Sequence, residues 1–168
     1  MAAVMNTDVN DLLSANTRAE IDSWVAKYPE DQKQSACMAA LRIVQDANNG
    51  YLTEPLMDAV ADYLDMPRIS VYEVATFYSM YELKPVGKHK ICICTNISCM
   101  LCGSDEVVEH LRKRLGIGLG ETTDDGRITL KEVECLGACV GAPMFQIGEH
   151  YHENLTPEKI DAILDQLD

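Results

Sequence analysis

Apolar residues in the first half of the chain recur at the spacing expected of helices. A first helix is predicted behind a cap at Asn16 or Thr17, with an apolar stripe made of Ile21, Trp24, Val25 and Tyr28. A second, over about residues 31–47, brings three apolar side chains to one face: Cys37, Leu41 and Val44. The run Asn48-Asn49-Gly50 then breaks the pattern.

Two further helices are predicted from start signals. Thr53-Glu54-Pro55 places proline in a first turn, and Met66-Pro67 ends the stripe that follows, which consists of Leu56, Ala59, Val60 and Tyr63. The segment Ser70-Val71-Tyr72-Glu73 fits a capping box that opens a fourth helix. Four short amphipathic helices with short breaks predict a small bundle.

The pattern changes at Lys84-Pro85-Val86-Gly87. Residues 89–94 place apolar side chains on both faces of a predicted strand, as in a strand that is covered on each side. Residues 103–115 return to helical spacing, and residues 127–133 alternate as a strand does. A shorter apolar run covers residues 144–147, and Thr156-Pro157-Glu158 opens a terminal helix.

These elements predict an α+β protein in two parts. Residues 1–85 form a small N-terminal helical bundle, and residues 86–168 form a small α/β domain in the order β-α-β-β-α. A chain of 168 residues is long enough for two small domains.

Four of the seven cysteines fall in two pairs where the predicted strands run out into loops. Cys94 and Cys99 form C-x4-C, and Cys135 and Cys139 form C-x3-C in a glycine-containing segment. A binuclear 2Fe–2S centre takes two cysteine sulfurs per iron, and loops allow four sulfurs to converge from one side. Glycine and alanine let backbone N–H groups approach the sulfurs. The pattern predicts an electron carrier whose ligands are Cys94, Cys99, Cys135 and Cys139.

Other metal sites remain as alternatives. Cys102 extends the first pair to the C-x4-C-x2-C spacing of a plant-type ferredoxin, although the paired second loop favours the set without it. A structural zinc site and a Cys99/Cys102 dithiol fit the spacing only loosely. A Rieske centre is excluded because no histidine has the required spacing. Cys37 and Cys92 are expected to be buried core thiols.

Charge and composition exclude several classes of function. The formal net charge of −13 disfavours nucleic acid as a partner. No apolar run approaches the length of a membrane span, so direct membrane insertion is not expected. The first ten residues carry no Lys or Arg, so we expect a cytosolic protein whose cysteines serve metal or redox chemistry. Gly116-Ile117-Gly118-Leu119-Gly120 lacks the nucleotide-binding spacing and is expected to be a flexible turn.

With these residues in view, the chain resembles the thioredoxin-like 2Fe–2S subunit family of respiratory complex I, which is NADH:quinone oxidoreductase. The resemblance lies in four stretches, namely residues 74–78, Cys94-Thr95-x3-Cys99, residues 123–126 and residues 134–143. It implies a thioredoxin-like second domain, and a 2Fe–2S cluster held by the two cysteine pairs. Cys102 departs from the family pattern.

The resemblance also implies partners and a location. The chain would be a peripheral-arm subunit that takes single electrons from the FMN of a larger flavoprotein subunit, which binds NADH. FMN and NADH would then be reached only through that partner, because hydride chemistry needs a flavin. The location implied is the cytoplasmic face of the inner membrane, through the complex.

Three rival functions are open. Similar subunits occur in the diaphorase part of NAD-coupled hydrogenases and formate dehydrogenases. A free-standing ferredoxin-like shuttle is a second possibility, although a shuttle has no need of the N-terminal bundle. A zinc module is the third, and it would be colourless.

Overall fold

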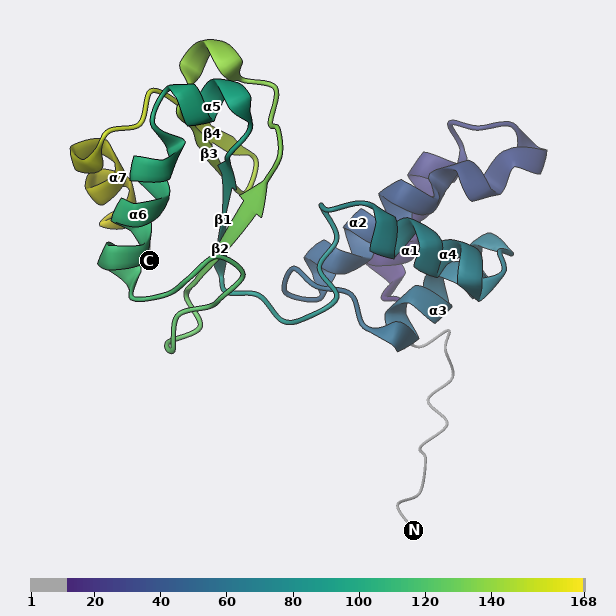
Figure 1. Cartoon of the computed structure of the whole chain (residues 1–168). Coiled ribbons are helices and arrows are strands. Elements are labelled where there is room, and N and C mark those ends of the chain that lie inside the picture. Colours follow the sequence, from purple (N-terminus) through teal and green to yellow (C-terminus); the bar gives the residue numbers. More distant parts are fainter. Residues whose placement is uncertain (1–11, 168) are drawn as a thin grey trace. The chain divides into compact units, whose positions relative to one another are not determined.

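A computed structural model describes residues 12–167 and divides the chain into two compact units. The boundary lies between Pro85 and Val86 (Figure 1). The described part of the first unit, residues 12–85, contains helices and no strand, and the second unit contains a four-stranded sheet with helices, so the predicted α+β class is confirmed.

The N-terminal unit is a bundle of α-helices. It consists of α1 (Ala15–Val25), a 3-10 helix η2 (Glu30–Ala36), α2 (Cys37–Ala47), α3 (Glu54–Leu64) and α4 (Arg68–Phe77). Its core contains the predicted apolar faces of α2 and α3, including Leu41, Val44 and Val60. Cys37 is buried in this core, and burial raises the pKa of its thiol to about 11. Cys37 is therefore a structural thiol, as predicted.

Several predicted helix ends in the bundle are wrong. The helix predicted over about residues 31–47 is a 3-10 helix, Glu30–Ala36, followed by α2, which begins only at Cys37. Ser14 caps α1 by accepting a hydrogen bond from the Thr17 N–H at 3.1 Å, so neither Asn16 nor Thr17 is the cap. The helix ends at Val25, which leaves Tyr28 outside it and exposed. The helix α4 begins at Arg68, directly after Pro67, so the expected capping box at residues 70–73 lies inside it.

The C-terminal unit is built on a sheet with strand order β2-β1-β3-β4. The strands are β1 (His89–Cys94), β2 (Ile128–Val133), β3 (Phe145–Ile147) and β4 (His150–His152). β1 and β2 are parallel and are joined through α5 (Ile97–Leu101) and α6 (Ser104–Leu115). A 3-10 turn, η3 (Cys139–Gly141), precedes β3, and α7 (Pro157–Leu164) closes the chain. Neither β4 nor α5 was predicted from the sequence, because each is too short to show a period.

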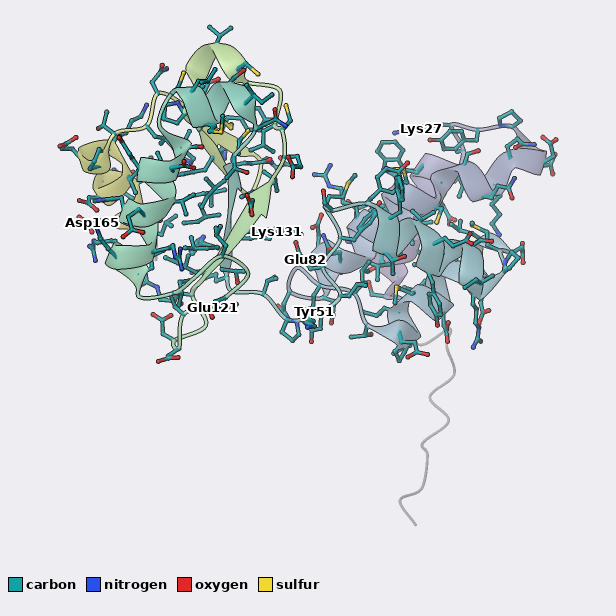
Figure 2. The ribbon with its side chains drawn as sticks, in the orientation of Figure 1. Lys27, Tyr51, Glu82, Glu121, Lys131 and Asp165 are labelled. Atoms are coloured by element: carbon teal, nitrogen blue, oxygen red, sulfur yellow. The ribbon has the colours of Figure 1, made fainter. Side chains whose placement is uncertain are left out.

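Helices cover one face of this sheet. The core of the unit is formed by apolar side chains of the strands and of α6 and α7, including Ile91, Leu130, Phe145, Leu111 and Ile160. Lys131 alternates with these residues along β2 and lies on the side of the sheet away from α6 and α7 (Figure 2). Lys90 and Cys92, on the same side of β1, are only partly buried. The prediction of a β1 strand buried on both faces is therefore wrong for this unit.

Candidate iron–sulfur site

The parallel pairing of β1 and β2 brings the two cysteine segments together. The register places Cys94, the last residue of β1, opposite Val133, the last residue of β2. Parallel strands end at the same edge of a sheet, so the segments that follow them start side by side. The Cys94 thiol lies 3.5 Å from the Glu134 carbonyl oxygen, which belongs to the residue before Cys135. Residues 40 positions apart in sequence are thus in contact at one edge.

The first cysteine segment leaves β1 and forms the short helix α5. Thr95 continues the sheet contact, since its N–H donates to the Val133 carbonyl at 3.2 Å. Asn96 then caps α5 by accepting the Ile97 N–H at 2.8 Å. This turn returns Cys99 toward Cys94, and both thiols are buried. The expectation that all four sulfurs come from loops is wrong for Cys99, which lies within α5.

The second cysteine segment is an irregular loop that ends in the turn η3. Gly137 adopts a positive φ of 78°, a conformation that glycine adopts without strain, midway between Cys135 and Cys139. Cys135 and Cys139 are both exposed. Leu136 and Ala138 pack against the buried cluster of Cys94, Cys99 and Met144, so the loop lies across the first segment. Figure 1 shows α5 and the η3 turn at the same end of the sheet.

Met144 forms the floor of this arrangement. Its side chain is 1 % exposed and packs with Cys94 and Cys99, and its carbonyl oxygen accepts the Cys94 N–H at 3.3 Å. Because this surrounding is apolar, burial raises the pKa of the Cys99 thiol to about 11, with a further contribution from its hydrogen bond to Cys94. The charge of Cys139 acts on Cys99 in the same direction. Cys99 is therefore near enough to two other predicted ligands, Cys94 and Cys139, for both to affect its pKa.

The donor set fits a binuclear centre. All seven cysteines are free, so no disulfide competes for these thiols. The four thiols divide into a buried pair, Cys94 and Cys99, and an exposed pair, Cys135 and Cys139. Two thiols per segment match the two sulfur ligands that each iron of a 2Fe–2S core takes. Within residues 12–167 the structure gathers no group of three or more Cys, His, Asp or Glu side chains placed to hold a metal ion, and this includes the four predicted ligands.

The remaining cysteines lie outside this set. Cys102 is the C-terminal cap of α5 and is exposed, whereas Cys99, three residues earlier, is buried. Cys92 lies within β1 and is partly buried rather than fully buried as predicted. Two residues that shape the site were missed in the sequence. These are Met144, which lies directly after Pro143 in the predicted apolar run, and Tyr151, whose hydroxyl contacts the second loop from β4.

The sequence matches a family model described as thioredoxin-like [2Fe-2S] ferredoxin over residues 21–168. Curated relatives match over most of their length. One is the NADH-quinone oxidoreductase E subunit of Rickettsia bellii, which is 48 % identical over 164 residues, covering 97 % of this chain and 98 % of the relative. An NADH-quinone oxidoreductase E subunit of Rhizobium meliloti is 47 % identical over 148 residues, covering 88 % and 86 %.

Solved structures share the fold. In the crystal structure of an NAD+-reducing [NiFe]-hydrogenase in the H2-reduced state, one chain matches with a TM-score of 0.67 and 21 % sequence identity. The match covers 78 % of this chain and 22 % of the hydrogenase chain, so this fold is one part of that longer chain. At this level of identity the likeness describes the fold alone.

Proposed function

The chain belongs to the thioredoxin-like 2Fe–2S ferredoxin family, and on that premise we propose that it is the electron-transfer E subunit of NADH–quinone oxidoreductase, respiratory complex I. The family resemblance stated from the sequence is confirmed by relatives of 46–49 % identity that carry this name. The observation that carries the proposal is structural. Two parallel strands end together, and each delivers one cysteine pair to the same edge of the sheet.

The ligands we propose are Cys94 and Cys99 for one iron, and Cys135 and Cys139 for the other. When bound, a 2Fe–2S centre supplies one-electron redox chemistry. The chain provides four thiols that lose their protons on binding iron, and an apolar floor at Met144 that keeps water from one side. The exposed second pair leaves the opposite side open to a partner, which an electron carrier needs.

The surface around the site supports docking of a flavoprotein subunit. Ile97 is 66 % exposed and Leu101 is 77 % exposed on α5, and Val140 is fully exposed on η3. Apolar side chains that rim a redox site on a surface mark a protein interface rather than a solvated face. NADH gives up its electrons as hydride, and a flavin accepts hydride. We therefore expect FMN and NADH to be bound by that partner, with the N-terminal bundle contributing further contacts to peripheral-arm subunits.

We expect this subunit to lie in the peripheral arm, at the cytoplasmic face of the inner membrane. Among residues 12–167 no helix is long and apolar enough to cross a membrane. The membrane contact would then come through other subunits.

The hydrogenase diaphorase remains the second candidate, since it shares the fold. This chain covers 98 % of the Rickettsia bellii relative at 48 % identity, but is only 21 % identical to the hydrogenase chain. The higher identity favours complex I. Co-purification separates the two, because the partners would be quinone-reducing subunits in one case and hydrogenase subunits in the other.

The test is metal and sulfide analysis of the anaerobically reconstituted protein, with electron paramagnetic resonance after dithionite reduction. We expect two irons and two acid-labile sulfides per chain and a signal that appears only on reduction. A colourless, zinc-containing protein, or one that takes up no iron, contradicts the proposal.

A further inference from the structure

The hairpin β3–β4 folds back on the second cysteine loop. β3 follows that loop, and a turn with Gly148 at a positive φ of 58° reverses the chain into β4. Tyr151 of β4 pairs with Gln146 of β3, so the segment that follows it runs back past the residues that precede β3. One side of the loop therefore lies against chain that comes after it in sequence.

Three hydrogen bonds join this returning segment to the loop. The Asn154 N–H donates to the Gly141 carbonyl at 2.6 Å, and the Leu155 N–H donates to the Pro143 carbonyl at 3.1 Å. These two bonds hold the end of the loop, next to β3. The third is made by a side chain, since the Tyr151 hydroxyl donates to the Leu136 carbonyl at 2.7 Å.

The Tyr151 bond is the one that reaches between the two ligands. Leu136 directly follows Cys135, and the Leu136–Gly137 peptide lies between Cys135 and Cys139. A trans peptide is planar, so its carbonyl and its N–H point in opposite directions. Holding the Leu136 carbonyl at Tyr151 therefore also sets the direction of the Gly137 N–H. Gly137 has a positive φ of 78° and no Cβ, so its own side chain does not restrict the orientation of this peptide.

We propose that Tyr151 is a positioning residue for the iron–sulfur centre, acting through the Leu136–Gly137 peptide between the ligands Cys135 and Cys139. This inference rests on the proposed ligand set. The hydroxyl donates a hydrogen bond to the Leu136 carbonyl, so this carbonyl points toward β4. The Gly137 N–H of the same peptide then points away from β4. Peptide dipoles and hydrogen bonds near the sulfurs tune the reduction potential of such centres.

The direction of the effect follows from charge. Reduction adds one negative charge, which a nearby N–H favours and a free carbonyl oxygen disfavours. Without the hydroxyl, the Leu136 carbonyl loses its donor and the peptide is free to turn. We expect the reduction equilibrium constant to fall by up to about tenfold, which corresponds to about 59 mV for a one-electron couple.

The test is Tyr151→Phe in the full chain, which removes the hydroxyl and keeps the ring. Tyr28→Phe in the N-terminal unit is the matched control, since it removes a tyrosine hydroxyl from the other unit. Redox titration followed by electron paramagnetic resonance should give a more negative potential for Tyr151→Phe at unchanged iron content, and the wild-type potential for the control. An unchanged potential in Tyr151→Phe overturns the inference.

A second measurement does not need the metal. Hydrogen exchange of the iron-free full chain should show faster exchange across residues 134–141 in Tyr151→Phe and not in Tyr28→Phe. Equal exchange rates in the two variants overturn the anchoring role whether or not Tyr151→Phe holds iron. If the wild-type protein takes up no iron, the proposed function is contradicted. The exchange measurement then tests only whether Tyr151 anchors the loop.

Discussion

The packing of Met144 leads to a testable prediction about stability, because its buried side chain packs against two proposed ligands, Cys94 and Cys99. Replacing Met144 by Ala removes three heavy atoms of a side chain that is 1 % exposed and leaves its backbone bond to Cys94 in place. Buried Met→Ala changes cost about 2–5 kcal/mol. Met144 belongs to a small cluster whose other neighbours, Leu136, Ala138 and Ala142, are only partly buried and can relax inward. We therefore expect the lower part of that range, about 2.5 kcal/mol.

That loss is large for a unit the size of residues 86–168. A change of 1 kcal/mol shifts the melting temperature of such a domain by about 4–8 °C, so Met144→Ala should lower it by about 10–20 °C. The assay is thermal unfolding of the iron-free chain by circular dichroism. Fluorescence of Trp24, the only tryptophan, reports on the N-terminal unit and should keep its wild-type transition.

Met100 supplies the matched control. It lies on α5 beside Cys99 but is 48 % exposed, so Met100→Ala should change stability by less than about 0.5 kcal/mol. Met144→Leu conserves volume and should cost less than about 1.5 kcal/mol. If Met144→Ala melts within a degree or two of Met100→Ala, then Met144 does not pack as the floor of the site, and the reasoning fails.

Three further predictions concern the ligands, the docking surface and the bundle. Cys99→Ser should abolish the reduced resonance signal while Cys102→Ser retains it, and loss of the signal in the second variant would move the ligand set to Cys102. Leu101→Asp should weaken co-purification with the flavoprotein at least tenfold while the iron content stays intact. Lys113→Asp changes a similarly exposed residue on α6 and should not weaken it. Equal recovery of the flavoprotein with both variants would place the interface elsewhere. Tyr81→Phe removes a hydrogen bond of 2.8 Å to the Met38 carbonyl and should cost about 1 kcal/mol at neutral pH. Burial raises the pKa of Tyr81 from 10 to about 12, so the stabilising effect of the neutral hydroxyl is complete below pH 10 and is lost as pH rises toward 12. The free energies of unfolding of wild type and Tyr81→Phe should therefore converge between pH 10 and pH 12. A constant difference across that window would refute the shift.

Much of the local structure could be predicted because its causes are local. The helices α3 and α7 begin where predicted, after Thr53 and Thr156. Both threonines cap their helices, since a capping side chain reaches only three residues along the chain. The span of β1 was also predicted in full from its composition. Helix ends were less predictable. The helix α4 begins at Arg68, directly after Pro67, whereas the capping-box pattern had suggested a start at Ser70, two residues later.

The sequence by itself supplied the proposed ligand set, which is four cysteines in two pairs, and the match to a 2Fe–2S family. Only the tertiary structure decided how they meet. The Cys94–Val133 register, the buried Cys94/Cys99 pair over Met144, and the Tyr151 bond to Leu136 all join residues distant in sequence. Periodicity and caps report on energies within one turn or strand, whereas these contacts depend on which strands pair and in which register. No local pattern carries that information, so it became visible only in the folded chain.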